Sequence, residues 1–330
     1  MKELLRVSNL KTYFYTYEGT VKAVDGVSFA LRQGETLGLV GESGCGKSVT
    51  ALSIMRLIPS PPGRILSGEV IFEGTNLLEL DERQMRRIRG CKISMIFQEP
   101  MTSLDPVFTV GHEIMETVSL HQGMKKGDAK QEAIEALKIV GMPDSEKRID
   151  NYPHELSGGM RQRAMIAMAL SCNPALLIAD EPTTALDVTI QAQILRLIDD
   201  LRSKFDTSVL LITHDLGVVS EMCDFVAVMY AGHIVEYTDI STLFEKPLHP
   251  YTVGLNRSIP RLDVETERLD TISGLVPNLI DLPPGCPFNP RCDHVMPVCR
   301  NVMPRLIEVE KNHLVKCHLF GEKDQNGTTR

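Results

Sequence analysis

Apolar and polar residues alternate along two stretches near the start of the chain, residues 7–17 and residues 21–31. Alternation of this kind is typical of strands that bury one face, and Glu18 and Gly19, which lie between the two stretches, suit a turn. The pattern therefore predicts two neighbouring strands joined by a tight connection.

Short apolar runs and helical periodicity then alternate along the middle of the chain. A short apolar run bounded by polar residues predicts a buried strand, whereas apolar residues three or four positions apart predict a helix. Strands that alternate with helices are typical of an α/β fold with a mostly parallel sheet flanked by helices. The predicted strands are residues 35–40, 175–179 and 208–213, and the predicted helices include residues 129–140, residues 189–205 and a helix that follows residue 47 and ends near Pro59.

Proline becomes frequent after residue 244 and breaks any long helix in that part of the chain. We therefore predict two unequal domains. The larger is expected at residues 1–244, with a helical part at residues 108–172, and a small irregular extension is expected at residues 245–330.

The composition argues against several classes of protein. The chain of 330 residues has 35 Lys and Arg against 43 Asp and Glu, a net charge of −8, which argues against a protein that coats nucleic acid or anionic lipid. Trp is absent, so there is little aromatic surface on which single-stranded nucleic acid could stack. The most apolar long window, residues 164–179, includes Ser171, Asn173 and Pro174 and is too polar to span a membrane. The start of the chain has no secretory signal pattern, so we expect a cytosolic protein.

The sequence Gly-Glu-Ser-Gly-Cys-Gly-Lys-Ser at residues 41–48 lies between a predicted strand and a predicted helix and matches the P-loop pattern. Its glycines allow backbone N–H groups to surround phosphate oxygens at a helix N-terminus, where the helix dipole favours negative charge. We predict that Lys47 contacts the β- and γ-phosphates of ATP and that the Ser48 hydroxyl binds Mg²⁺. The predicted nucleotide-binding residues here are Gly41, Ser43, Gly44, Cys45, Gly46, Lys47, Ser48 and Val49.

Two acidic residues, Asp180 and Glu181, end the apolar run Leu-Leu-Ile-Ala. A buried strand that ends in two carboxylates places the first where it can bind Mg²⁺ and the second where it can orient or deprotonate water. Taken with the P-loop, this pattern predicts hydrolysis of the nucleotide as well as binding.

The sequence Leu-Ser-Gly-Gly at residues 156–159, together with these two motifs, resembles the signature of the ATP-binding cassette (ABC) ATPases. The resemblance implies a RecA-like core with an antiparallel β subdomain and a helical subdomain. It also implies that Ser157, Gly158 and Gly159 contact the nucleotide held by a second cassette. The alternative is that Ser157 is only a helix N-cap.

Further family positions match in order along the chain. Gln98 resembles the Q-loop glutamine, which touches Mg²⁺ and the attacking water. Thr184-Ala-Leu-Asp187 resembles the D-loop, so Asp187 is a candidate at the nucleotide. His214 resembles the switch histidine that contacts the γ-phosphate. The resemblance therefore implies catalytic roles for Gln98, Glu181 and His214, and Mg²⁺ binding by Ser48, Gln98 and Asp180.

The family stacks adenine on an aromatic residue of its first strands, and Phe14 is our candidate here. Tyr13, Tyr15 and Tyr17 are competitors. The alternative for each is a place in the strand core.

Three further stretches are similar to the dipeptide/oligopeptide importer subfamily, namely residues 41–47, 97–106 and 249–251. Residues 285–292 are similar to the C-terminal extension of that subfamily. The resemblance implies a D-type ATPase subunit on the cytoplasmic face of the cell membrane. Its implied partners are a second ATPase subunit, two membrane permeases that meet the loop at residues 99–101, and, indirectly, an extracytoplasmic peptide-binding protein. A homodimer is possible in isolation, and no nucleic acid is expected. The rival functions are a soluble ABC ATPase that acts on nucleic acid or ribosomes and a regulatory module that binds ATP without cleaving it.

Four of the eight cysteines crowd the C-terminal extension. In a reducing compartment, such clustering favours metal over disulfides. The spacing is longer than that of common zinc sites, and Cys286-Pro287 is similar to the Cys-Pro element of some ferredoxins, so we predict a 4Fe–4S cluster. Zinc, to which His294, His313 and His318 could contribute, and free or disulfide-linked thiols are the alternatives. The candidate ligands are Cys286, Cys292, Cys299 and Cys317.

Overall fold

The computed structural model describes the whole chain except residues 1, 99–102, 185–186, 259–271 and 322–330. It forms two compact units whose segments alternate along the sequence. The first unit consists mainly of Glu79–Ile212 with Arg32–Glu35, and the second of Glu3–Leu31, Thr36–Leu78 and Thr213–Arg330. The predicted boundary at residue 244 stays a prediction.

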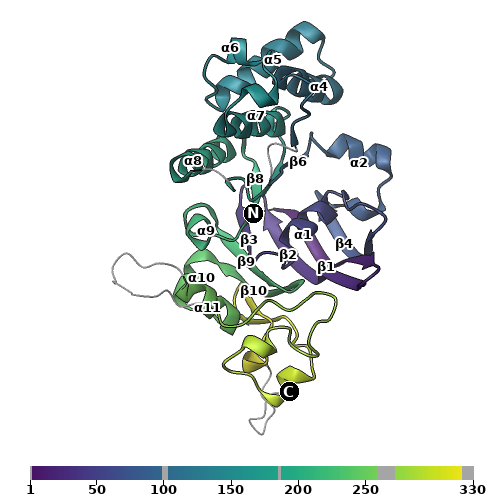
Figure 1. Ribbon diagram of the computed structural model, residues 1–330, viewed down its shortest axis with the longest axis vertical. Coiled ribbons are helices and arrows are strands. Elements are labelled where there is room, and N and C mark those ends of the chain that lie inside the picture. The colour runs from purple at the N-terminus through teal and green to yellow at the C-terminus, as the bar shows by residue number, and fades with distance from the viewer. Residues whose placement is uncertain (1, 99–102, 185–186, 259–271, 322–330) are drawn as a thin grey trace. The chain divides into compact units, whose positions relative to one another are not determined.

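An antiparallel sheet opens the second unit, with the strand order β2-β1-β4-β5. The two alternating stretches of the sequence are β1 and β2, as predicted, and the turn lies between Thr16 and Gly19. In Figure 1, these two long strands and β4 lie side by side. The strands of this sheet are β1 (Glu3–Thr16), β2 (Gly19–Arg32), β4 (Gly63–Phe72) and β5 (Thr75–Asn76).

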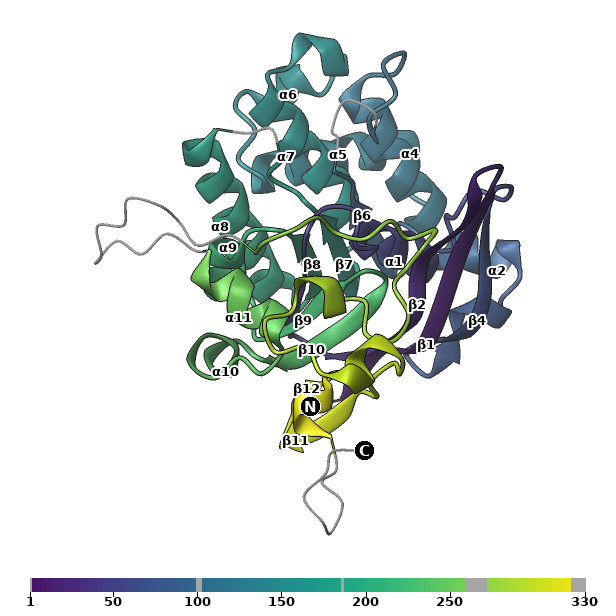
Figure 2. The ribbon, with the colours of Figure 1, turned by 60° about the horizontal axis from the view of Figure 1, so that its bottom comes forward.

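A second group of strands in the same unit runs in the order β11-β12-β10-β9-β3. All five residues of β3 are buried, which agrees with the apolar run in the sequence, and β3 pairs with β9 in parallel. The C-terminal extension joins this sheet, because β12 pairs with β10 and Figure 2 shows them beside each other. The strands are β3 (Thr36–Val40), β9 (Phe225–Tyr230), β10 (His233–Asp239), β11 (Ile307–Glu310) and β12 (His313–Val315).

Four α-helices lie in the part of the second unit that the structure describes. The helix after the P-loop is shorter than predicted and ends at Ile54 instead of near Pro59, because Arg56 adopts a left-handed φ of 52° and turns the chain. The helices are α1 (Lys47–Ile54), α9 (Leu216–Met222), α10 (Ile240–Glu245) and α11 (Pro250–Arg257).

In its described residues, the first unit has three parallel strands, β6, β7 and β8, and a group of helices. The helix predicted at residues 129–140 is confirmed as α5, and its apolar residues Ala133 and Leu137, with Val140 directly after it, are buried. Helices α4, α5 and α7 pack together (Figure 1). The elements are α2 (Glu82–Ile88), β6 (Ile93–Ile96), α4 (Val110–Gln122), α5 (Lys126–Ile139), α6 (Ser145–Arg148), α7 (Gly158–Leu170), β7 (Leu176–Asp180), α8 (Val188–Phe205) and β8 (Ser208–Thr213).

A buried carboxylate, Glu236 on β10, joins the C-terminal extension to the rest of its unit. Its two oxygens accept hydrogen bonds from the backbone N–H groups of Leu248 and His249, each at 2.8 Å. His313 Nε2 on β12 lies 2.7 Å from the same carboxylate. Glu236 is fully buried, so it links β10, the start of α11 and β12 out of contact with solvent.

The remainder of the extension is irregular, as the prolines predict. It contains the short 3₁₀ helices Asn289–Arg291, Pro297–Arg300 and His318–Phe320. Its own apolar cluster is small and consists of Leu248, Val315 and Cys317 with Ile307 and Phe320 packed against it. Across the described part of the chain, no helix combines the length and apolar character needed to cross a bilayer.

Candidate nucleotide-binding and hydrolysis site

The loop from Gly41 to Ser48 leads from β3 to α1 and requires glycine at two positions. Gly41 has φ 153° and Gly46 has φ 109°. A Cβ atom on Gly41 would lie 2.1 Å from the carbonyl oxygen of Met229, and one on Gly46 would lie 2.1 Å from that of Ala23. Both positions therefore exclude any side chain, and the loop can keep its backbone N–H groups close to a phosphate.

Lys47 is buried at the start of α1 and folds back over this loop. Its Nζ donates to the carbonyl oxygens of Gly41 at 2.7 Å and Glu42 at 3.1 Å. This places the ammonium group inside the curve of the loop. A phosphate bound there would meet a desolvated positive charge, which is the role that the sequence predicts for Lys47.

The other residues of the loop differ in exposure. Ser43 and Gly44 are exposed, Ser48 and Val49 are half-buried, and Cys45 is fully buried. Burial raises the pKa of the Cys45 thiol. Cys45 therefore packs beneath the loop, whereas the exposed residues leave its outer side open to a ligand.

Glu42 has two partners from the C-terminal extension that the sequence analysis missed. Its backbone N–H donates to the hydroxyl of Tyr251 at 2.9 Å, and its carboxylate pairs with Arg291. Tyr251 lies in one of the stretches used for the family resemblance, but no pattern in the sequence relates Arg291 to a loop 249 residues earlier.

In the first unit, the chain turns sharply where β7 ends. Asp180 is its last, buried residue, and Glu181 follows with a left-handed φ of 44°. A non-glycine residue in this conformation stores backbone strain, which is common at functional positions.

The side chains of Gln98 and Thr184 contact the Glu181 carboxylate. Gln98 Nε2 donates to Glu181 Oε2 at 3.2 Å, and the Thr184 hydroxyl donates to the same oxygen at 2.8 Å. The structure thus brings together two of the three predicted catalytic residues, and Thr184 is an addition that sequence reasoning did not single out. A carboxylate held by two donors in this way is oriented to accept a proton from water.

The Leu-Ser-Gly-Gly sequence starts helix α7, and Ser157 is the N-cap of that helix. Its hydroxyl accepts from the N–H of Met160 at 3.4 Å. Gln162, buried on the same helix, donates to the carbonyl oxygen of Pro182 at 2.5 Å. The signature helix is therefore tied to the segment that follows Glu181. The capping role agrees with the alternative that Ser157 is only a helix N-cap. It also leaves Gly158 and Gly159 at a helix N-terminus, where anions bind.

Two further predicted residues lie beside helix starts. His214 is exposed and follows β8, directly before the N-cap Asp215 of α9. Asp187 is the N-cap of α8 and accepts from the N–H of Ile190 at 2.9 Å. Their contacts with a nucleotide stay predictions. The predicted permease contact at residues 99–101, and Ala185 and Leu186 of the predicted D-loop, lie outside the described residues.

Three of the candidates for the adenine contact, Tyr13, Phe14 and Tyr15, lie on β1, and Tyr17 follows in the turn after it. Tyr13 is half-buried, and burial followed by a hydrogen bond to Asp25 raises its pKa to about 12. Phe14 is half-buried opposite Gly63 of β4, whereas Tyr15 is 50% exposed and Tyr17 is 97% exposed. The hydroxyl of Tyr13 is thus engaged, and the choice of Phe14 stays a prediction.

The C-terminal cysteines do not support the predicted metal centre. Among the described residues, which include all four candidate ligands, no group of three or more His, Cys, Asp or Glu side chains could hold a metal ion. Cys317 packs in the apolar cluster of the extension. Burial raises the pKa of Cys286 to about 11 and that of Cys317 to about 12, and neighbouring thiols add to the rise. The four thiols are close enough to interact electrostatically, but they do not form a ligand set in this geometry.

Comparison with known proteins identifies related chains over nearly the whole sequence. A family model described as ABC transporter matches residues 24–184, and one described as the C-terminal region of oligopeptide/dipeptide transporters matches residues 235–299. The chain is 54% identical to the oligopeptide transport ATP-binding protein AppD of Bacillus subtilis, with 98% of each chain covered. It is also 54% identical to the oligopeptide transport ATP-binding protein OppD of Salmonella typhimurium, with 91% of this chain and 89% of the relative covered.

Solved structures give the same result for the fold. The post-hydrolysis dimer of the ATP-binding cassette MJ0796, bound to ADP and Pi, matches with a TM-score of 0.64 at 26% identity. The match covers 72% of this chain and 98% of that one. The predicted cassette fold is therefore confirmed.

Proposed function

This chain belongs to the family of ABC transporter ATP-binding proteins, and we propose that it hydrolyses ATP to energise the import of di- and oligopeptides. The observation that carries the proposal is the contact of Gln98 with Glu181, one residue beyond the buried Asp180. The names of its relatives, which are peptide transport ATP-binding proteins, support peptides as the substrate class.

In this proposal, the predicted residues divide the work of the reaction. Lys47 neutralises the β- and γ-phosphates, and Ser48, Gln98 and Asp180 would supply oxygen ligands to Mg²⁺. Gln98 positions the attacking water, Glu181 accepts its proton, and His214 contacts the γ-phosphate. Mg²⁺ bound by these residues would supply positive charge to stabilise the negative charge on the phosphoryl oxygens.

A second cassette completes each nucleotide site in the proposed assembly. Ser157, Gly158 and Gly159 would contact ATP held by the partner, as backbone N–H groups at a helix N-terminus can. We propose a heterodimer with a second ATPase subunit, attached to two membrane permeases at the cytoplasmic face of the membrane. A peptide-binding protein on the opposite side would deliver the substrate.

The experiment that tests the proposal is Glu181→Gln in the complex with its permeases. The amide keeps the size of the side chain but cannot take a proton from water, so we expect ATP binding to persist and steady-state hydrolysis to fall by about 10²-fold or more. Glu310→Gln, which alters an exposed carboxylate in the extension, is the matched control. Hydrolysis by Glu181→Gln at the rate of the unaltered complex would refute the proton-accepting role.

The metal centre at Cys286, Cys292, Cys299 and Cys317 remains a prediction of the sequence alone. Anaerobic purification followed by visible absorbance and by iron, sulfide and zinc analysis decides between its alternatives. Brown protein with iron and sulfide would support a 4Fe–4S cluster, colourless protein with one zinc ion per chain would support zinc, and protein with neither would leave free or linked thiols.

A further inference from the structure

We propose that Arg291, in the C-terminal extension, is a positioning residue for the phosphate-binding loop and acts through Glu42. The inference rests on the proposed role of residues 41–48 in binding ATP. It gives the extension a part in nucleotide affinity, which Arg291 exerts through its ion pair with Glu42.

The ion pair between these residues has two parallel hydrogen bonds. Arg291 Nη1 lies 2.7 Å from Glu42 Oε2, and Nη2 lies 3.0 Å from Oε1. The Arg291 side chain is only 4% exposed, and that of Glu42 is 30% exposed. Bidentate pairs of this kind fix direction as well as distance, and burial protects them from screening by salt.

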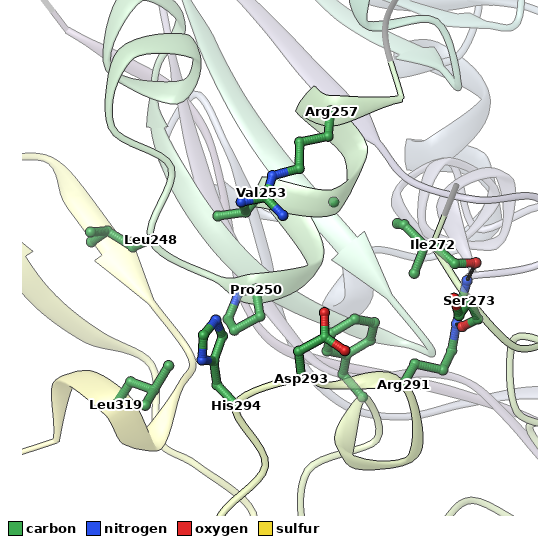
Figure 3. Close-up of a pocket in the computed structure, with 12 residues that line it drawn as sticks. Leu248, Pro250, Val253, Arg257, Ile272, Ser273, Arg291, Asp293, His294 and Leu319 are labelled. Atoms are coloured by element: carbon green, nitrogen blue, oxygen red, sulfur yellow. Dashed lines mark hydrogen bonds between the residues drawn. The ribbon is translucent and has the colours of Figure 1, made fainter. Parts of the chain in front are cut away.

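The remaining donors of Arg291 are also used, so the guanidinium group has a single orientation. Its Nε donates to the carbonyl oxygen of Ser273 at 3.0 Å, and Figure 3 shows these two residues side by side in the wall of a cavity of about 380 Å³. Nη2 also donates to the Ile272 carbonyl at 3.3 Å, and Nη1 to the Tyr230 hydroxyl at 3.4 Å. A guanidinium held by five acceptors cannot rotate freely, so it fixes the position of the Glu42 carboxylate.

The extension holds the backbone of Glu42 as well. Tyr251 on α11 accepts its N–H at 2.9 Å and is fully buried. The Tyr251 ring lies 4.7 Å from that of Tyr230 and 5.5 Å from that of Phe288. Arg291 lies against the same cluster, 5.8 Å from the Tyr230 ring centre and 5.9 Å from that of Phe288. Both ends of Glu42 are therefore anchored to one rigid aromatic group.

Glu42 is placed to pass this restraint to the phosphate site. Its carbonyl oxygen accepts from Lys47 Nζ, and it follows Gly41, whose backbone leaves no space for adjustment. Freeing the Glu42 carboxylate would leave a partly buried negative charge inside a loop that must bind polyphosphate. We expect the main effect to be on ATP affinity and not on the chemical step, because the ion pair holds the loop that is proposed to bind the phosphates.

The test measures the affinity of the purified full chain for Mg²⁺-ATP by calorimetry, in a double-mutant cycle. We expect Arg291→Met to weaken binding by about tenfold, as loss of a charge-assisted pair implies. Glu42→Gln should weaken it less, and the double variant should be no weaker than Arg291→Met, because the two changes remove one interaction. Arg291→Lys keeps the charge but not the fork, so it should fall between Arg291→Met and the unaltered chain.

Lys246→Met is the matched control, because it removes an exposed ion pair with Glu310 in the same extension and should leave affinity unchanged. In the permease complex, Arg291→Lys should raise KM for ATP with kcat within about twofold of the unaltered complex, a split that general loss of structure would not produce. Hydrogen exchange of residues 41–48 should rise in Arg291→Lys and stay unchanged in Lys246→Met.

Three outcomes would overturn the inference. They are unchanged affinity in both Arg291 variants, a loss of affinity in the double variant equal to the product of the two single losses, or a fall in kcat alone. Lys47→Ala separates this failure from that of the proposed function. If the unaltered chain binds ATP and Lys47→Ala does not, unchanged Arg291 variants reject only the role of Arg291. If Lys47→Ala binds ATP normally, the assignment of the loop itself is wrong.

Discussion

Removal of the buried carboxylate of Glu236 should release the C-terminal extension from β10. We consider two substitutions of different severity, Glu236→Gln and Glu236→Ala. Both act on the same three hydrogen bonds, to Leu248 N–H, His249 N–H and His313 Nε2. The prediction is that the cost rises in steps with the number of donors left without an acceptor.

The magnitude follows from those contacts. In Glu236→Gln, one carboxylate oxygen becomes an amide nitrogen, which faces the N–H of His249 donor to donor. One buried N–H left unsatisfied costs about 2 kcal/mol. In Glu236→Ala, three buried donors lose their acceptor together, and we expect about 4 kcal/mol, as for a buried pair broken from one side.

Native-state hydrogen exchange is the suitable assay, because a chain with two compact units need not unfold in a single transition. Peptides that cover β12 and the start of α11 should exchange about 30-fold faster in Glu236→Gln and about 10³-fold faster in Glu236→Ala, since 1.4 kcal/mol corresponds to about tenfold. Exchange in α5, which belongs to the other unit, should not change.

Two outcomes would contradict this prediction. If both variants exchange like the unaltered chain at β12, the buried contacts of Glu236 contribute nothing to docking of the extension. If Glu236→Gln costs as much as Glu236→Ala, the effect comes from the lost charge and not from the number of unsatisfied donors.

Two other positions give independent predictions. Gly46→Ala would place a methyl group 2.1 Å from a backbone carbonyl of β2, so we expect loss of ATP binding and a lower melting temperature, measured by calorimetry; normal binding would show that the loop can shift. His249 is buried, and its pKa falls from 6.5 to about 3 because burial disfavours the charged form. As pH drops from 6.5 towards 3, the unfolded chain takes up a proton at His249 and the native chain does not, so stability falls with pH. His249→Asn retains an acceptor for the Tyr251 N–H but does not titrate, so urea midpoints measured between pH 6.5 and 4 should depend less on pH, and an unchanged slope would contradict this.

Local patterns in the sequence were sufficient to predict several strands and the separate motifs, but they did not single out β4, β9 or β10. The alternation in β1 and β2, and the apolar runs in β3, β7 and β8, report burial directly, so these strands were predicted to within a few residues. The loop at residues 41–48 could be predicted equally well, because its glycines satisfy a backbone requirement that is local.

Contacts that join distant segments of the chain could not be predicted from local patterns. Gln162 follows the Leu-Ser-Gly-Gly motif on the same helix, but its bond to the Pro182 carbonyl depends on the packing of α7. Arg291 lies in an irregular segment without periodicity, so nothing local indicates its partner. The metal prediction went further than the structure supports for a related reason: cysteine spacing does not reveal that Cys317 packs with Leu248 and Val315.

The parallel pairing of β3 with β9 determines when the phosphate-binding loop can be completed during synthesis. Leu37 pairs with Phe225, so the strand that precedes the loop waits for its neighbour while 188 further residues are made. At ribosomal speeds, this delay is about 10–40 s. Throughout that time, the backbone N–H and C=O groups on this edge of β3 lack their partner strand. Arg291 is synthesised later still. The nascent chain therefore carries its most characteristic sequence early and acquires the folded loop near the end, which makes premature termination before β9 a route to aggregation and not to a shortened ATPase.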